Sequence, residues 1–328
     1  MDNISNIFLN ACKTGQKGII EAFVKKGGID FNKRDELGNS ALFYAAQKGA
    51  RDIVKILLNA GADAGMANNA SVAPMHAAAG IGAKEIARLL IDAGVDVNAT
   101  TKEGKTPLMF ALSNSKTEAA KFLLGAGADK AILDNEGHSA MDYATANGLR
   151  DIVAELQGAD GAGTGAKDKH GNTPLIQAAA NGQTELIAAL IPGNDVNALN
   201  DGGESALIVA AAGDNLAIAE LLLKNGADAN QKRLDGVGAL HIAAGNGNTF
   251  MARALIKAGA DADLRNEVGQ TPLIIGAMRG KNDITRLLID AGADVNAIDN
   301  GGQSVMAYAA ENGFTEITEQ LIAAGAEN

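Results

Sequence analysis

Two glycine-containing segments of the sequence have residue types that could bind phosphate groups. Gly104-Lys105-Thr106 ends like a phosphate-binding loop, in which backbone amides and a lysine surround the phosphates of a nucleotide. That loop requires a glycine five residues before the Gly-Lys pair, and Ala99 stands at this position. The segment Gly161-x-Gly163-x-Gly165 has the wrong spacing for a dinucleotide loop and follows a predicted helix. We therefore interpret the first segment as a turn and the second as a flexible linker.

The other groups that could do chemistry are the histidines, the single cysteine and the acidic loop residues. His138 and His170 lie at similar places in neighbouring segments, so a shared metal ion and an ordinary contact role both stay open. Cys12 is the only cysteine, which excludes an intrachain disulfide and a cysteine-based zinc site. Acidic groups such as 294–296 lack the alternating ligands, the glycine and the closing glutamate of a calcium loop. Since we find no Ser/His/Asp constellation either, we predict a protein without catalytic residues, cofactor or enzymatic activity, and we assign no metal ligands.

The composition favours thin helical layers and limits the kinds of partner. Apolar residues make up 47% of the 328 residues but aromatic residues only 3%, with no tryptophan, so most core side chains must be small or branched. The formal net charge of −11 repels phosphate backbones and anionic membranes, and no run of lysine or arginine offsets it locally. The N-terminus has no basic start followed by an apolar run, and no stretch approaches about 18 apolar residues. We therefore expect a cytoplasmic protein that binds neither nucleic acid nor membrane.

A short pattern recurs along the whole chain at a nearly constant interval. It consists of a small or hydroxyl residue, then proline or a small residue, then a large apolar residue. The intervals between successive copies are 33, 33, 33, 34, 32, 33, 33 and 33 residues. We call the first residue of each copy the anchor; the anchors are Ser40, Ala73, Thr106, Ser139, Thr173, Ser205, Gly238, Thr271 and Ser304. Such a fixed period predicts an array of stacked structural repeats.

Each part of the repeating unit has a physical reason. A serine or threonine anchor caps a helix, and the proline that often follows it fits the first helical turn. The small pair that comes later, such as Ala45-Ala46, allows close packing of this helix. A second apolar run such as 53–58 has the i, i+3, i+4 spacing of an amphipathic helix, and a following glycine ends it. Because an Asp-x-x-Gly turn comes next, the predicted unit is helix, turn, helix and a long loop that doubles back.

Together these features resemble the ankyrin repeat. The resemblance rests on Asp-x-x-Gly-x-Thr-Pro-Leu-His-x-Ala-Ala and on the ending Leu-Leu-x-x-Gly-Ala-Asp-Val-Asn, and residues 101–135 follow this pattern closely. It implies an all-α fold, an ankyrin-repeat solenoid of about ten helix-turn-helix units with hairpin-like loops. It also implies structural hydrogen bonds from His76 and His241 between loops. The expected organisation is an N-terminal capping repeat (1–32), repeats 2–5 (33–160), a glycine-rich joint (161–167), repeats 6–9 (168–298) and a C-terminal capping repeat (299–328).

The middle of the chain departs most from the repeat. Gln157 replaces an expected leucine, and four glycines follow between residues 158 and 165, together with one inserted residue. Glycine increases the freedom of the backbone and weakens helix ends. We expect a weakened joint at 157–167, which is either a functional hinge or a loop under relaxed constraint. Ser115 and Asp214 replace the usual glycine between two helices and predict altered turns there.

The resemblance implies that a partner binds at the hairpin tips and the inner helices, on the concave side of the array. The predicted protein-binding residues are Glu36, Leu37, Asn39, Gln47, Val72, Lys102, Lys105, Asn135, Glu136, His138, Lys169, His170, Glu204, Leu234, Asp235, Val237, Asn246, Glu267, Val268, Gln270, Met278 and Arg279. Large exposed apolar groups mark interaction sites, and the apolar candidates are Val72, Leu234, Val237, Val268 and Met278. Four of these five belong to repeats 8 and 9, which we expect to be the main contact region; the alternative is that each valine packs on a neighbouring tip.

These observations predict a protein-protein interaction module, an adaptor, inhibitor or effector, whose partner is another protein. The alternative is a ligand-sensing or enzyme-associated repeat protein with a small-molecule site near the central joint, and a purely structural spacer is a third reading. An interaction module should lose its partner when tip residues change, whereas a ligand sensor should gain thermal stability from a metabolite. We expect a monomer, because both ends of the array look like capping repeats.

Overall fold

The computed structural model describes residues 3–157 and 167–327, and these residues form twenty α-helices and no β-strand. Each pair of consecutive helices makes one repeat, so that α1 and α2 belong to repeat 1, and α19 and α20 to repeat 10. This arrangement confirms the predicted all-α array of helix-turn-helix units. The helices are α1 (Asn3–Thr14), α2 (Lys17–Lys26), α3 (Ala41–Lys48), α4 (Arg51–Asn59), α5 (Pro74–Ile81), α6 (Lys84–Asp92), α7 (Pro107–Ser113), α8 (Thr117–Gly125), α9 (Ala140–Ala146), α10 (Arg150–Gln157), α11 (Pro174–Ala180), α12 (Thr184–Leu190), α13 (Ala206–Ala212), α14 (Leu216–Lys224), α15 (Ala239–Asn246), α16 (Thr249–Lys257), α17 (Pro272–Met278), α18 (Asn282–Asp290), α19 (Val305–Glu311) and α20 (Thr315–Ala323).

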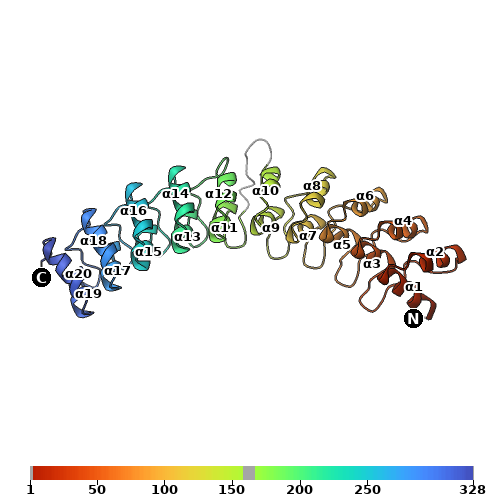
Figure 1. Cartoon of the computed structure of the whole chain (residues 1–328), viewed down its shortest axis with the longest axis horizontal. Helices are drawn as coiled ribbons and strands as arrows, with labels where there is room; N and C mark the ends of the chain where they lie inside the picture. The colour runs from red at the N-terminus through yellow and green to blue at the C-terminus, as the bar shows by residue number, and fades with distance from the viewer. Residues whose placement is uncertain (1–2, 158–166, 328) are drawn as a thin grey trace. The chain divides into compact units, whose positions relative to one another are not determined.

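The helices are arranged in two rows within each part of the chain (Figure 1). Within each part, odd-numbered helices pack against the second helix of their own repeat and against the odd-numbered helices of adjacent repeats, as α5 does with α6, α3 and α7. We call the odd-numbered helices inner helices and the even-numbered ones outer helices. Long loops connect one repeat to the next and form hairpins. Isolated β-bridges close three of these hairpins, between Arg34 and Ser40, Lys232 and Gly238, and Ile298 and Ser304.

The chain divides into two compact units, residues 1–156 and residues 157–328. The N-terminal unit contains α1 to α10 and the C-terminal unit contains α11 to α20, so each has five repeats. Most of the joint expected at 157–167 lies outside the described residues, because the description stops at 157 and resumes at 167. The choice between a hinge and a relaxed loop therefore stays a prediction, as do the boundaries of the capping repeats.

The anchors start the inner helices in the way their chemistry predicts. Oγ of Ser40 accepts a hydrogen bond from the backbone N–H of Phe43 at 3.1 Å. Oγ1 of Thr106 accepts one from the backbone N–H of Met109 at 3.3 Å, and Pro107 occupies the first turn of that helix. A side-chain cap of this kind stabilises a helix by about 1 kcal/mol. The cap recurs at the serine and threonine anchors and fixes where those inner helices begin, whereas the anchors Ala73 and Gly238 have no side-chain cap.

The turn between the two helices of a repeat needs a residue with a positive φ. Glycine supplies it in most repeats, for example Gly82 with a φ of 80°. Ser115 and Asp214 adopt the same left-handed conformation, with φ values of 55° and 53°. The turns therefore keep their geometry at these two positions, contrary to our expectation. Ser115 and Asp214 adopt this conformation at a conformational energy of about 1 kcal/mol each, because their Cβ atoms crowd the backbone there.

The core is a thin layer of buried side chains between the two rows of helices. Ile53, Val54 and Leu57 of α4 are at most 3% exposed, and the same pattern recurs in the other outer helices. Burying a side chain of this size stabilises the fold by about 1.5–3 kcal/mol. Ala45 and Ala46 of α3 are fully buried, so the small pair lets inner helices approach closely. Stability is therefore spread over many similar layers, as in other repeat arrays.

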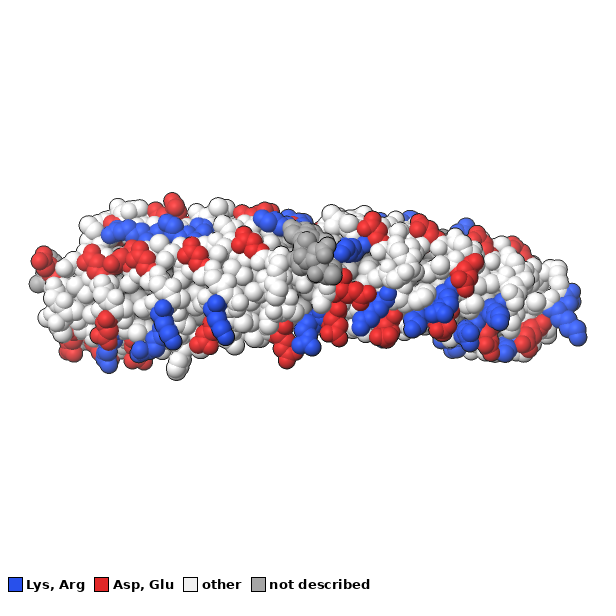
Figure 2. Space-filling model, turned by 90° about the horizontal axis from the view of Figure 1, so that it is seen from above, with Lys and Arg blue, Asp and Glu red and all other residues white. Residues whose placement is uncertain are grey.

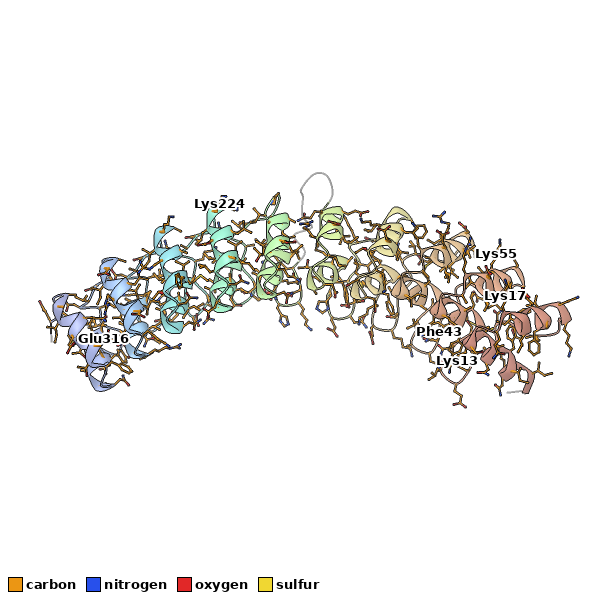
Figure 3. All side chains as sticks on the ribbon, viewed as in Figure 1. Lys13, Lys17, Phe43, Lys55, Lys224 and Glu316 are labelled. Atoms are coloured by element: carbon orange, nitrogen blue, oxygen red, sulfur yellow. The ribbon has the colours of Figure 1, made fainter. Side chains whose placement is uncertain are left out.

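The face formed by the outer helices carries acidic and basic side chains that are interspersed in both units (Figure 2). Lys17 of α2 donates to Asp52 of α4 across 2.9 Å, and Arg286 of α18 donates to Glu316 of α20 across 3.1 Å; Figure 3 labels Lys17 and Glu316. Exposed ion pairs of this kind contribute little to stability, because water and salt screen them. None of the helices in the described residues is long and apolar enough to cross a membrane.

Candidate functional site

Most hairpins are held in shape by one aspartate or asparagine side chain at their base; Thr101 takes this role in repeat 4, and Arg233 stands at this position in repeat 8. In repeat 2, Oδ1 of Asp35 accepts hydrogen bonds from the backbone N–H groups of Leu37 at 3.0 Å and of Asn39 at 2.8 Å. Oδ2 of the same carboxylate accepts a hydrogen bond from the hydroxyl group of Tyr44. The same bonds from residues two and four positions later occur at the corresponding residues of other repeats. The backbone of the tip residues, here Glu36 and Leu37, is therefore held in one conformation.

Adjacent hairpins are joined by a regular backbone hydrogen bond. At each tip, one N–H group donates to a carbonyl oxygen of the preceding hairpin, over 2.9 to 3.2 Å. Within each unit the tips therefore form a continuous edge, and a surface that is already ordered loses less conformational entropy when a partner binds. The donors and acceptors are Asn69 to Leu37, Lys102 to Ala70 and Asn135 to Glu103 in the N-terminal unit, and Asp201 to His170, Leu234 to Gly202, Glu267 to Asp235 and Asn300 to Val268 in the C-terminal unit.

His76 and His241 have the structural role that the repeat pattern implied. Both side chains are buried, with at most 1% of their surface exposed. Nδ1 of each ring accepts a hydrogen bond from the backbone N–H of its own anchor at 3.1 Å, so Nε2 carries the ring proton. Nε2 donates across 3.1 Å to the carbonyl oxygen of Lys105 in one case and of Gln270 in the other. Burial lowers the pKa of both histidines, which keeps them neutral and preserves this pattern of bonds.

Most of the predicted protein-binding residues lie on the surface of the tips and inner helices. The exposed ones are Glu36, Leu37, Gln47, Lys102, Asn135, Glu136, Lys169, His170, Leu234, Asp235, Asn246, Glu267, Val268 and Arg279. The half-buried ones are Val72, Lys105, His138, Glu204, Val237, Gln270 and Met278. Since the two units are placed separately, the residues of each unit form their own row along the tips.

Asn39 is the exception, because only 6% of its surface is exposed. Its side-chain amide donates to the hydroxyl group of Tyr44 at 3.2 Å. Its side-chain carbonyl oxygen accepts a hydrogen bond from the amide of Asn68, in the next hairpin, at 2.9 Å. Asn39 therefore joins two hairpins in this structure, and we withdraw it from the predicted contact surface.

The apolar candidates separate into two groups. Leu234 and Val268 are strongly exposed, with 75% and 55% of their surfaces accessible, and they lie on adjacent tips. Val72, Val237 and Met278 are half-buried, so we no longer count them among the exposed tips. The two exposed side chains are therefore concentrated in repeats 8 and 9.

Five predicted residues meet in one pocket between repeats 8 and 9. Val237, Asn246, Gln270, Met278 and Arg279 line this pocket, which has a volume of about 280 Å³. Sequence reasoning missed its remaining lining residues, which are Arg233, His241, Ile242, Gly245, Asn266 and Ile275. The signal that could have found them is Gly245, because most repeats carry a side chain at this position, seven residues after the anchor.

Arg233 at the edge of the pocket is held by two acidic side chains. Its Nη2 donates to Oδ2 of Asp235, and its Nη1 lies 3.8 Å from Oε1 of Glu204. The hydrogen bond between Arg233 and Asp235 raises the pKa of the guanidinium and lowers the pKa of the carboxyl group. The charge of Arg233 is therefore compensated within the protein, and Arg279 is the second arginine that lines the pocket.

The two histidines considered as metal ligands belong to different units. In the N-terminal unit, Nδ1 of His138 lies 3.5 Å from Oδ2 of Asp134 and 3.8 Å from Oε2 of Glu136, within one hairpin. His170 lies on an exposed tip of the C-terminal unit. Within residues 3–157 and 167–327, no group of three His, Cys, Asp or Glu side chains could hold a metal ion. The small-molecule site expected near the joint falls largely on residues outside this described part.

The two units differ in charge. The N-terminal unit has 17 basic and 18 acidic residues, and the C-terminal unit has 11 and 21, so their formal net charges are −1 and −10. The tips of repeats 7 to 9 follow this bias with Asp201, Asp235 and Glu267, of which Asp235 is paired with Arg233 at the base of its hairpin. The edge beside the pocket is therefore acidic, and such a surface attracts a basic partner.

Comparison with known proteins gives one family and several relatives. The profile of a family described as "Ankyrin repeats (3 copies)" matches residues 2–68, 74–164, 143–233 and 240–328. The human "Neurogenic locus notch homolog protein 1" is 37% identical over 210 residues, which is 64% of this chain, and its mouse counterpart is 35% identical over the same length. The human "Neurogenic locus notch homolog protein 2" is 34% identical over 210 residues. The matched segment is only 6% of each relative's length, and ankyrin repeats in general mediate protein-protein interactions.

Proposed function

The chain belongs to the ankyrin-repeat family, and on that premise we propose that it is a protein-interaction module that binds a partner protein at repeats 8 and 9. The observation that carries this proposal is the pair of exposed apolar side chains, Leu234 and Val268, on adjacent hairpin tips. The backbone N–H of Glu267 donates to the carbonyl oxygen of Asp235 at 3.0 Å, which joins these two tips. The module acts as an adaptor, inhibitor or effector, as a monomer, without a cofactor or a catalytic step.

Energetics favour this surface over other parts of the tip rows. Covering Leu234 and Val268 would contribute up to about 1.5–3 kcal/mol each, since both are largely accessible before binding. The pocket next to them offers a place for a side chain of the partner, and a few such buried anchors usually dominate the affinity of an interface. The acidic tips around them would steer a partner with a basic surface. The same charge disfavours nucleic acid as the partner.

The test is a pull-down from a lysate of the source cells with three baits, each checked by circular dichroism to be folded. The first bait is the native chain, and the second carries Leu234→Glu and Val268→Glu. The third is a matched control with Phe250→Glu and Ile298→Glu, because these side chains are 71% and 51% exposed outside the proposed surface. We expect a protein that is retained by the native and control baits and lost by the second.

Two outcomes would contradict the proposed surface. A partner retained equally by all three baits would leave a binding protein but remove repeats 8 and 9 as its site. In that case a fourth bait with Leu37→Glu would test the exposed tip of repeat 2, where 68% of the leucine surface is accessible. Failure to retain any protein with the native bait would argue against the interaction module itself.

A further inference from the structure

The pocket between repeats 8 and 9 has a close counterpart between repeats 3 and 4. In both places a buried histidine, His76 or His241, bonds to its anchor and to the next hairpin over the same distances of 3.1 Å. In both places a glycine follows four residues later, Gly80 or Gly245. We call the buried histidine and this glycine the frame of each repeat. Repeats 3 and 8 have the same frame, and they differ in the side chains that the next repeat places against it.

In repeats 3 and 4 an aromatic ring packs against this frame. The ring of Phe110 lies edge-on to the ring of His76, with the ring centres 5.1 Å apart. A methyl group added to Gly80 would lie 3.6 Å from Cδ1 of Phe110, which is an ordinary packing distance. Phe110 therefore packs beside the histidine and next to Gly80, where a methyl group would also fit.

In repeats 8 and 9 the position of Phe110 is taken by Ile275, which has no ring. The pocket of about 280 Å³ lies at this place and is lined by His241, Gly245 and Ile275 among others. The position of Asn114 is taken by Arg279, whose Nη1 would lie 2.9 Å from a methyl group added to Gly245. Its guanidinium group therefore lies over Gly245, at the wall of the pocket.

We infer that this pocket receives an aromatic side chain from a basic segment of a partner protein. The inference rests on the proposed function and names the group that the partner inserts. Ile242 and Met278 supply apolar walls, and the guanidinium of Arg279 offers a cation to the face of an aromatic ring. The volume lies at the lower end of the range of about 300–1,000 Å³ that is usual for ligand sites, so the pocket suits a small group such as one side chain.

The residues that flank the aromatic group are expected to be lysine or arginine. The tips beside the pocket carry Asp201 and Glu267 in addition to Asp235, whose charge is paired with that of Arg233, and the C-terminal unit as a whole has ten more acidic than basic residues. Oδ1 of Asp214 accepts a hydrogen bond from the amide of Asn246, at 3.2 Å, which places one more carboxylate near the pocket. Charges of opposite sign on the partner would increase the rate of association and fix its orientation.

The protein has no tryptophan, so the fluorescence of a tryptophan in a probe peptide can be excited selectively. The probe is a seven-residue synthetic peptide in which two lysines and one serine flank a central tryptophan on each side. Titration with the full chain should shift the emission of this peptide to shorter wavelength in a saturable way. A peptide with glutamate in place of every lysine tests the opposite charge and should bind more weakly. A third peptide keeps the lysines but has alanine in place of tryptophan, and as a competitor it should not displace the probe.

Two double variants exchange the side chains that face the two frames. Ile275→Phe with Arg279→Asn copies repeat 4 into repeat 9 and should weaken binding of the lysine probe by about ten-fold or more, as the loss of an interface anchor does. The reciprocal variant, Phe110→Ile with Asn114→Arg, leaves the proposed pocket untouched and should retain at least native affinity. Because each variant uses side chains that the fold already carries at the equivalent position, both should keep the native circular dichroism spectrum.

Three results would overturn the inference. These are equal or tighter binding of the glutamate peptide, unchanged affinity after Ile275→Phe with Arg279→Asn, and no saturable shift with the native chain. Each is distinguishable from failure of the proposed function, which the pull-down measures with a full-length partner. If the partner depends on Leu234 and Val268 but not on Ile275, the interaction surface stands and the aromatic anchor does not.

Discussion

Asp134 illustrates how one carboxylate can hold a whole hairpin. Its Oδ1 accepts hydrogen bonds from the backbone N–H groups of Glu136 and His138, both at 2.9 Å, and its Oδ2 accepts one from the hydroxyl of Tyr143 at 2.7 Å. Burial alone would raise the pKa of Asp134, since only 1% of its side chain is accessible. The hydrogen bonds outweigh burial and hold the pKa below its usual value. The ionised form is therefore part of the folded hairpin.

Replacing Tyr143 with phenylalanine should weaken this hairpin and make it more sensitive to acid. A group whose pKa is lowered by folding stabilises the protein above its unfolded pKa, and that contribution disappears as the pH falls through the folded pKa. Tyr143→Phe removes one bond to Asp134, so the folded pKa should rise and acid unfolding should begin at a higher pH. At neutral pH the free energy of unfolding should fall by about 1.5–3 kcal/mol, the usual value of a hydrogen bond to a charged group.

Urea unfolding at neutral pH and an acid titration, both followed by circular dichroism, would measure the effects of this substitution. Tyr308→Phe is the matched control in repeat 10, where the Tyr308 hydroxyl donates to Asp299 at 2.7 Å, but Asp299 is half-buried whereas Asp134 is buried. We expect a smaller loss there, because water can replace the missing bond. Equal losses at both sites, or an unchanged acid midpoint after Tyr143→Phe, would contradict the role assigned to Asp134.

At the scale of single elements, the conformation of a hairpin depends on its packing against the next hairpin along the chain. Gly236 has a φ of 76°, and a methyl group added to it would lie 2.6 Å from the backbone nitrogen of Glu267 in the next hairpin. Gly302 has a similar φ of 81°, but no atom lies within 4 Å of a methyl group added to it. The two glycines therefore separate the cost of the backbone conformation from the cost of close packing between hairpins.

We expect Gly302→Ala to lower the free energy of unfolding by about 1 kcal/mol, since alanine disfavours the left-handed conformation. Gly236→Ala should cost about 2 kcal/mol more, because the added methyl group must push the next hairpin away. Urea unfolding of the two variants provides the comparison. Amide hydrogen exchange at Glu267 provides a second measurement. The hydrogen bond from its backbone N–H to the carbonyl oxygen of Asp235 should break in the Gly236 variant alone, so exchange should become faster there. Equal stabilities of the two variants would mean that the hairpins do not support each other.

The elements themselves could be predicted because every one is encoded by local chemistry that repeats. The hydroxyl anchors, the small pairs and the closing glycines each act within a few residues, so the fixed period gave the helix pairs and the turns. The histidine bonds followed from the same pattern at His76 and His241. The burial of Asn39 could not be predicted, because it depends on the side chains of Tyr44 and of Asn68 in another repeat.

The pocket was missed for a similar reason. Its lining residues come from two hairpins and from α15 and α17, so no single repeat contains the whole pocket. Ile275 stands where Phe110 stands in repeat 4, and Gly245 stands at the same position of its repeat as Gly80. Single-sequence patterns predict the period, whereas a pocket arises from differences between copies of the period. Differences such as Ile275 in place of Phe110 become visible only when equivalent positions of the repeats are compared.

At the scale of the whole molecule, the division into two units has consequences for folding and for binding. Each unit contains five helix pairs with their own buried layers, and repeat arrays need about three repeats to be stable. Contacts in such arrays link neighbouring repeats, so stability grows by addition of similar layers. The charge is not shared equally, because the C-terminal unit carries nearly all of the net negative charge.

We therefore expect residues 1–160 and 161–328, produced as separate fragments, to fold independently. Each should show a helical circular dichroism spectrum and a cooperative urea transition, because its buried layers lie within its own unit. The C-terminal fragment should retain the partner captured by the full chain, since it contains Leu234, Val268 and the pocket. Its association rate should fall more steeply with salt than that of a neutral complex, because its formal net charge is −10. An unfolded fragment would show that the two units stabilise each other, and capture of the partner by the N-terminal fragment would place the binding surface in the other unit.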